Sequence, residues 1–309
     1  MTDVRPLRWH DLPLAYRLAG HGVSFDTQLR ITIGDDPLRQ ALLTSLGRTH
    51  IYVLRYDEEG GLGQLHYPAQ QSVARLAYIA PMLESAEDEG LWLSLLDGLA
   101  VAAGQRGAVN IIAEVDDDSP LMDILRRANF GVYARQELWR RTRHANGEPT
   151  GVLRPAHEAD EIAMRVLYSE LTSGLMRQVE PLSTVADAIY VMEGPQGRNH
   201  IIGMVIEHRG VRRNMLEMYL SPAAGERADA FVREALALSA NPDRPVYCRI
   251  RCKVAALGMS LSEHGFEPMA SQAVMVRHTA ARIKHHAFEK LPVIDSIMPA
   301  ANRITDVGD

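Results

Sequence analysis

The sequence contains few of the residues from which disulfide-bonded or metal-binding proteins are built. Its 309 residues include only two cysteines, Cys248 and Cys252, both in the segment VYCRIRCKV. On a β-strand these two side chains share a face about 13 Å apart, too far for a disulfide. The 12 histidines show no spacing typical of a zinc site. We therefore expect two buried thiols, no disulfide and no metal ion.

Long apolar runs and an excess of positive charge are also missing. No apolar stretch approaches the roughly 20 residues that a membrane-spanning helix needs, and the opening MTDVRPLRWHD lacks the apolar segment of a signal peptide. The formal net charge of −6 gives no reason to expect a nucleic-acid partner. With 46% apolar and 23% charged residues, the composition is that of a folded protein. We expect a cytoplasmic protein with no membrane or nucleic-acid partner.

The chain does contain an internal repeat, which is visible as three pairs of similar segments. The pairs are VRPLRWHD (4–11) with LRPAHEAD (153–160), YIAP (78–81) with YLSP (219–222), and LRRANFGVYARQ (125–136) with LSEHGFEPMASQ (261–272). They are offset by 149, 141 and 136 residues, so the second copy has shorter loops. The segment RTRHANGEPTGV, with its turn residues, separates the copies as a linker.

Each copy has the same predicted order of elements. An Arg-Pro strand precedes a helix with apolar spacing, and a meander (HIYVLRY or HIIGMVIEH) leads to the Tyr-x-x-Pro strand. A long helix, an apolar strand, a short helix and a final strand follow. This order predicts an α/β protein with a mixed sheet covered by helices. We predict one domain over residues 1–145, a second over 146–280, and a tail over 281–309.

This layout resembles the GCN5-related N-acetyltransferase (GNAT) family, present twice in one chain. The resemblance rests on the VRP…D and LRP…D openings, the Tyr-x-x-Pro strands and the closing Phe-x-x-x-Ala-x-Gln. It implies two tandem GNAT-like domains, with acetyl-CoA or another acyl-CoA as co-substrate. The implied acceptor is an amine, either a small molecule or a protein N-terminus or lysine. Family members bind acyl-CoA where two central parallel strands separate, and a Gln/Arg-x-x-Gly-x-Gly/Ala loop wraps the pyrophosphate with backbone N–H groups.

The resemblance places the pyrophosphate loop on very different residues in the two copies. In the first copy it falls on Glu84–Glu89 (ESAEDE), where the acids suit a helix N-terminus but repel a diphosphate. We therefore expect no CoA binding by the first domain. In the second copy it falls on Gly225–Ala230 (GERADA), which makes Arg227, Ala228 and Ala230 the expected cofactor-binding residues. The alternative for this segment is a plain helix start that binds no ligand.

Acetyl transfer to an amine requires a base for the amine proton and an acid for the leaving thiolate. Leu125 and Leu261 stand where the resemblance implies a tyrosine acid. Glu217 is the carboxylate of the strand LEMY and the expected base, directly or through water, and Tyr219 shares its strand face. The alternative is an exposed glutamate beside a half-buried tyrosine. The predicted function is acyl-CoA-dependent N-acyl transfer in the C-terminal domain, and the alternative is a protein that binds a ligand or partner without catalysis.

Overall fold

A computed structural model describes residues 4–43, 47–56, 59–69, 71–84, 86–141, 150–239, 245–251 and 255–279. Cys248 is a free, buried thiol, as expected. Cys252, most of the predicted linker and the tail over 281–309 lie outside the described residues. Within the described ranges, no helix combines the length and the apolar character needed to cross a membrane.

Both copies contain the predicted elements in the predicted order. The strands of the first copy are β1 (Arg5–Pro6), β2 (Val23–Ser24), β3 (Thr49–Tyr56), β4 (Glu59–His66), β5 (Val73–Ala80), β6 (Asn110–Asp116) and β7 (Gly131–Arg141). Its helices are α1 (Leu12–Leu18), α2 (Thr27–Thr32), α3 (Pro37–Leu43), α4 (Ala86–Gln105) and α5 (Leu121–Arg127). The strands of the second copy are β8 (Arg154–Pro155), β9 (Ala188–Gly194), β10 (Gly197–His208), β11 (Asn214–Leu220), β12 (Val246–Ile250) and β13 (Phe266–His278). Its helices are α6 (Glu161–Leu171), α7 (Gly174–Val179), α8 (Ala228–Leu238) and α9 (Ala255–Glu263), with a 3₁₀ helix η3 (Pro222–Arg227) before α8.

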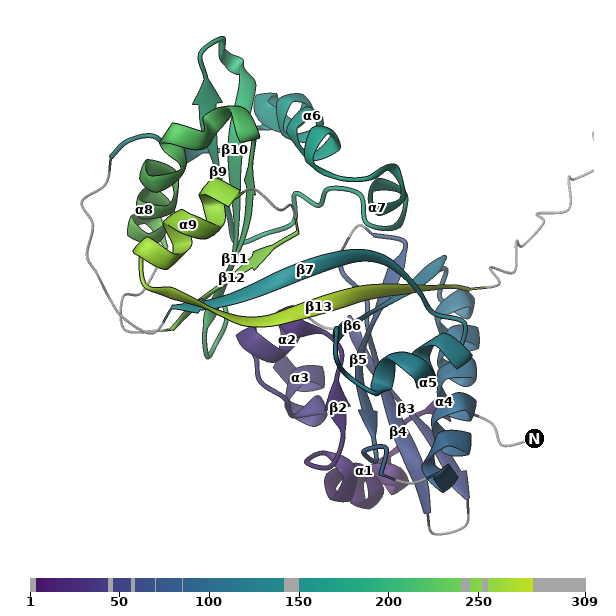
Figure 1. The fold of residues 1–309 in the computed structure, drawn as a ribbon. Coiled ribbons are helices and arrows are strands. Elements are labelled where there is room, and N and C mark those ends of the chain that lie inside the picture. Colours follow the sequence, from purple (N-terminus) through teal and green to yellow (C-terminus); the bar gives the residue numbers. More distant parts are fainter. Residues whose placement is uncertain are drawn as a thin grey trace, which may run out of the picture.

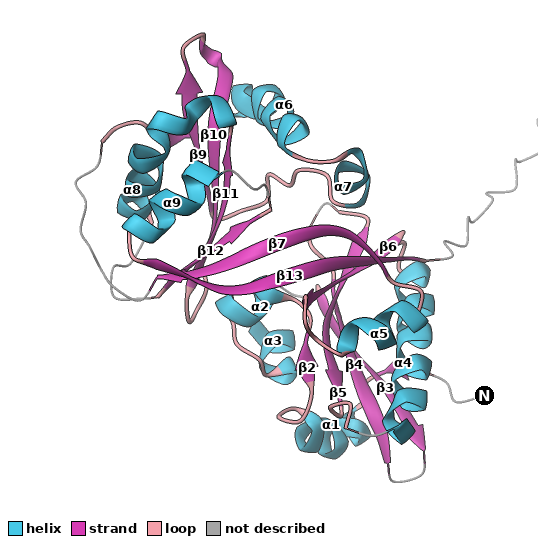
Figure 2. Ribbon diagram, viewed as in Figure 1, coloured by secondary structure: helices cyan, strands magenta, loops and turns pink. Residues whose placement is uncertain are grey.

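The strands of both copies join into one continuous mixed sheet, with helices on its faces (Figure 2). The strand order is β1-β3-β4-β5-β6-β13-β7-β12-β11-β10-β9-β8, and β2 pairs with β5 outside this path. The central strands β5 and β6 are parallel, and so are their counterparts β11 and β12. The fold is therefore the α/β arrangement of two helix-covered half-sheets that the alternating elements predict.

The Arg-Pro motifs form the same local structure in both copies. The guanidinium of Arg5 donates two hydrogen bonds to the Asp11 carboxylate, at 2.6 and 2.9 Å. The guanidinium of Arg154 does the same with Asp160, at 2.6 and 2.8 Å. The paired geometry fixes the chain between the first strand and the first helix of each half. It confirms the repeat that the spacing of these residues indicates.

The closing strand of each copy leaves its own half and completes the other half. Strand β7 of the first copy pairs with β12, and β13 of the second copy pairs with β6. The two closing strands also pair with each other in antiparallel register and run side by side between the halves (Figure 1). Gln136 faces Gln272 in that register, and these residues occupy the same position of the repeat. A local twofold axis therefore passes between them.

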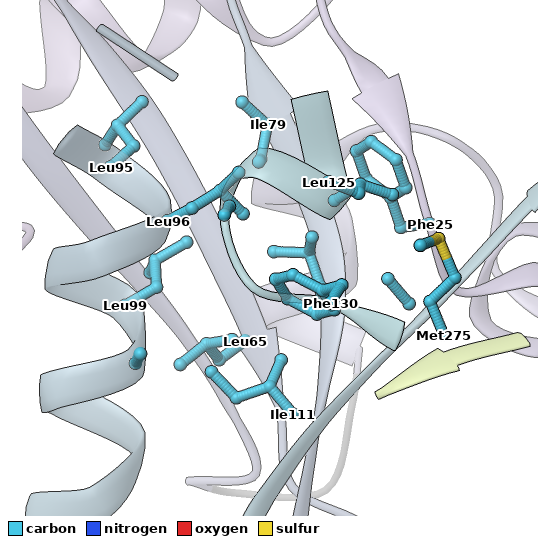
Figure 3. Packing of buried hydrophobic residues seen from close by; sticks show 14 of the residues in the cluster. Phe25, Leu65, Ile79, Leu95, Leu96, Leu99, Ile111, Leu125, Phe130 and Met275 are labelled. Atoms are coloured by element: carbon cyan, nitrogen blue, oxygen red, sulfur yellow. The ribbon is translucent and has the colours of Figure 1, made fainter. Parts of the chain in front are cut away.

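The exchange of closing strands is visible in the cores. In the first half, α4 and α5 pack on the sheet through a cluster that includes Leu99 and Phe130 (Figure 3). Met275, from β13 of the second copy, is fully buried in the same cluster. In the second half, Trp139 from β7 of the first copy packs into the core under α8 and α9. Each core is thus completed by a side chain that belongs to the other copy.

Candidate active site

The two central parallel strands of each half pair over a few residues and then separate. In the first half the pairs run from Val73 with Asn110 to Arg75 with Ile112. In the second half they run from Asn214 with Val246 to Glu217 with Arg249. The gaps beyond the last pairs correspond to the place where the GNAT resemblance implies acyl-CoA. The two halves therefore offer two equivalent gaps, which differ in what surrounds them.

A segment of the chain fills the gap of the first half. Strand β2 pairs with β5, with Val23 opposite Ile79. The next residue but one, Phe25, donates its backbone N–H to the Ala77 carbonyl at 3.0 Å and accepts the N–H of Glu114 on β6 at 2.9 Å. The Phe25 ring lies 2% exposed in the core of this half and is labelled in Figure 3. In the second half, the β11–β12 pairing ends at Glu217 and Arg249. Beyond that pair, no strand among the described residues pairs with the edge of β11 that faces β12.

A polar pocket of about 170 Å³ lies beside the second gap, next to α6 and the segment that follows α7. The polar side chains that line it come from both halves. The second half contributes Tyr168, Glu180, Ser183, His208, Glu217, Tyr219, Arg249 and Arg251. The first half contributes Asp26, Gln28, Thr32, Arg48, His66, Gln71 and Arg75. The pocket therefore depends on how the two halves sit together.

Buried ion pairs adjoin the pocket and connect the two halves. Their members are Arg75, Glu114, Glu180, Glu217, Arg249 and Arg251. Arg75 of the first half pairs with Glu180 of the second, and Arg249 of the second pairs with Glu114 of the first at 3.1 Å. Three arginines face three glutamates, so the buried formal charge is balanced. Such pairs are costly to break from one side, because the remaining partner is left as a buried unpaired charge.

The arginines keep the buried carboxylates ionised. Burial by itself would raise the pKa of Glu114, but Arg249 and Arg75 lower it to about 2. Burial opposes ionisation of Glu217 as well, yet Arg249 and the hydrogen bond with His208 hold its pKa well below the usual value. Because proton affinity falls with pKa, an ionised Glu217 is a weak proton acceptor.

The two predicted catalytic residues lie together in this pocket. Tyr219 donates its hydroxyl to Oε2 of Glu217 at 3.2 Å, which confirms that strand alternation places them on one face. Glu217 is buried (8% exposed), and the alternative of an exposed glutamate is wrong. Burial and the nearby Glu217 charge raise the pKa of Tyr219 well above 10, so the phenol keeps its proton. The ring of Tyr219 packs edge-on against that of Tyr168 on α6.

His208 belongs to this site and is not predicted by the sequence. It is the last residue of β10, and its Nε2 lies 2.9 Å from Oε1 of Glu217. The contact joins neighbouring antiparallel strands, in which His208 stands opposite Met215. The final histidine of HIIGMVIEH is the only sequence signal for it, and a polar residue at a strand end is too common to single out.

The predicted cofactor-binding residues lie at the junction of η3 and α8. Arg227 donates from Nη1 to the backbone carbonyl of Glu193 at 2.9 Å. Ala228 donates its backbone N–H to the Gly225 carbonyl, and its methyl group is buried in the core under α8. Ala230 is half-buried in the first turn of α8. None of the three predicted residues lines the pocket at Glu217, so the structure does not bring the predicted cofactor and catalytic residues into one cavity.

The acidic loop of the first half makes its contacts with the start of α4 and with α5. The N–H of Glu84, just before α4, donates to Oδ2 of Asp88 in the first turn of that helix at 3.1 Å. Glu89 pairs with Arg127 of α5 at 2.5 Å. Acids at this position favour the helix N-terminus, as expected. The side chain of Glu87 lies outside the described residues.

Searches against protein-family models and against curated proteins find no match. Solved structures do match. A GCN5-related N-acetyltransferase from Sphaerobacter thermophilus superposes with a TM-score of 0.52 at 13% identity, covering 89% of this chain and 95% of that one. A tandem GNAT protein from the clavulanic acid biosynthesis pathway, solved without AcCoA, gives 0.50 at 13% identity, covering 90% and 99%. The chain has the GNAT fold. It has that fold twice, in tandem, as the repeat predicts.

Proposed function

We propose that the protein is an acyl-CoA-dependent N-acyltransferase that works in its C-terminal half. The proposal is carried by the difference between the two strand gaps. The gaps have the same register, but the first holds the backbone of Val23–Phe25, whereas the second opens beside a polar pocket. The acyl acceptor, a small primary amine or an amine-bearing chain end, enters the pocket at Glu217, and acyl-CoA enters the gap between β11 and β12.

The first half shapes this site and does not bind CoA. The backbone of Val23–Phe25 occupies the edge of β5 that an inserted cofactor arm would need. Carboxylates of Asp35, Glu114 and Asp116 line the cavity at this gap and repel a diphosphate. Arg75 contributes instead to the wall of the acceptor pocket in the other half.

The first turn of α8 holds the pyrophosphate. Arg227 supplies a cation there, and the N-terminus of the 11-residue α8 favours an anion. The small side chain of Ala230 leaves room for phosphate to approach the backbone, and Ala228 packs this turn against the core with its N–H bonded to the Gly225 carbonyl. Arg227 exchanges its bond with the Glu193 carbonyl for one with phosphate, which is the stronger hydrogen bond because both partners are charged.

A thermal-shift titration with acetyl-CoA tests cofactor binding. A ligand at 100 times its Kd adds about 2.7 kcal/mol to the free energy of unfolding. Arg227→Glu should remove the shift. Arg127→Glu makes the same charge change at the acidic loop of the first half and should leave the shift intact. A shift that survives Arg227→Glu and is lost in Arg127→Glu would place the cofactor in the first half and contradict the proposal.

A second candidate function, ligand binding without catalysis, is favoured by two observations. Leu125 and Leu261, which stand where the resemblance implies a tyrosine acid, are both fully buried in the cores. The low pKa of Glu217 also makes it a poor base. A stabilising response to acetyl-CoA combined with no release of CoA thiol for any amine would support this second candidate.

A further inference from the structure

We propose that His208, not Glu217, takes the proton of the acceptor amine, and that Glu217 orients the His208 ring. This inference rests on the proposed N-acyl transfer and concerns the same pocket. His208 and Glu217 both line the pocket and lie 2.9 Å apart, between Nε2 and Oε1. The arrangement is a histidine held by a carboxylate, in which the carboxylate selects the tautomer.

The contacts of Glu217 leave it no free oxygen. Its Oε1 accepts from His208 and from the Arg249 guanidinium, and its Oε2 accepts from the Tyr219 hydroxyl. A proton placed on Glu217 would therefore compete with an arginine, a histidine and a phenol for the same two oxygens. Glu217 is also held in its ionised form by Arg249, which makes it suited to receiving a hydrogen bond and unsuited to accepting a proton.

His208 has the opposite properties. Because its Nε2 faces an ionised carboxylate, Nε2 carries the hydrogen and Nδ1 carries the lone pair. Nδ1 has no hydrogen-bond partner among the residues that the structure describes, and the side chain is 13% exposed. The bare Nδ1 of a neutral imidazole can accept a proton and return it to water.

The proton balance of the reaction requires such a group. The acceptor arrives as an ammonium ion and gives one proton to Nδ1 of His208, which frees the nitrogen lone pair. The nitrogen then forms a bond to the thioester carbonyl carbon, and the carbon–sulfur bond breaks with its electron pair on sulfur. The second nitrogen proton goes to the leaving thiolate, which gives an amide and CoA thiol. His208 finally releases its proton to water.

The test compares two small acceptors with acetyl-CoA, and release of CoA thiol is the readout. Ethylamine is an ammonium ion at neutral pH and needs a base, whereas hydroxylamine is largely neutral and does not. His208→Gln keeps a donor toward Glu217 but removes the base, and His208→Ala removes both. We expect both variants to lose about 10²-fold of turnover with ethylamine and little with hydroxylamine. His278→Ala is the matched control, because this histidine bonds to Asn110 on β6 and does not line the pocket.

Equal losses with both acceptors, or no loss with either, would overturn the role of His208. The ¹⁵N NMR spectrum of the histidine-labelled protein gives a second readout that requires no turnover. For His208 we expect a hydrogen on Nε2 and a lone pair on Nδ1. The reverse tautomer would contradict the proposal even if the enzyme were fully active. If the wild-type protein binds acetyl-CoA but acylates neither amine, the proposed function fails, and the role of His208 fails with it.

Discussion

Gln136 and Gln272, which occupy equivalent positions of the two copies, hydrogen-bond to each other at the local twofold axis. Nε2 of Gln136 donates to Oε1 of Gln272 at 2.9 Å. This hydrogen bond runs from Gln136 to Gln272, so the pair has a direction. Nε2 of Gln272 continues to Asp116 at 3.0 Å, whereas Oε1 of Gln136 accepts a hydrogen bond from Arg251 of the second copy at 3.1 Å. Sequence divergence between the copies therefore sets the polarity of the contact that joins them.

The exchange of closing strands predicts that a residue near the C-terminus stabilises the N-terminal half. Met275 of β13 is fully buried in the core of the first half. Met275→Ala should lower the free energy of unfolding by about 2–5 kcal/mol, because it leaves a cavity. Hydrogen exchange should show faster opening of β5 and β6. Met269, on the same strand and 48% exposed, is the control, and its alanine variant should change stability by less than about 0.5 kcal/mol. If faster hydrogen exchange were confined to the second half, β13 would not complete the core of the first half.

The segment that fills the first gap depends on close backbone contact at Gly22. A β-carbon there would lie 2.3 Å from the Ile79 carbonyl oxygen and 2.5 Å from the Tyr78 ring. Gly22→Ala should therefore destabilise the protein by about 1–3 kcal/mol and speed hydrogen exchange at Val23–Phe25. Gly20→Ala meets no atom within 4 Å and should have almost no effect. Equal stability of the two variants would show that β2 does not lie against β5.

The buried ion pairs predict a loss of stability in acid. The pKa of Glu114 is about 2 in the folded protein, compared with 4.5 as its ordinary value. Between these values the unfolded chain binds more protons, so stability is complete above about pH 4.5 and falls as the pH approaches 2. The expected contribution of Glu114 is about 3 kcal/mol, measured by denaturant titration at a series of pH values.

Glu114→Gln provides the comparison for this titration. It removes the charge while it keeps the size, so it should lower stability at neutral pH by leaving Arg249 and Arg75 short of a partner. The pH dependence below 4.5 should become shallower, and the remaining slope belongs to other carboxylates with lowered pKa, such as Glu180. An unchanged slope would mean that Glu114 does not titrate in this range.

The sequence predicts this fold well where the signals are local. The Arg-Pro-to-Asp spacing, the Tyr-x-x-Pro strands and the apolar periodicity recur, and each describes contacts between residues that are close in the chain. Strand alternation likewise places Glu217 and Tyr219 on one face without knowledge of the fold. His208 and the segment at Val23–Phe25 escape prediction because their partners are distant in sequence and their residue types are ordinary.

The amino-acid sequence by itself determined that this protein is a repeat of one α/β unit, and which of its two loops carries crowded acids. Tertiary structure alone decided that the closing strands cross over and that six buried charges meet between the halves. The physical reason is that a strand satisfies the same backbone hydrogen bonds and buries the same apolar face beside either copy. Only the packing of the whole chain determines whether a closing strand pairs within its own half or with the other half.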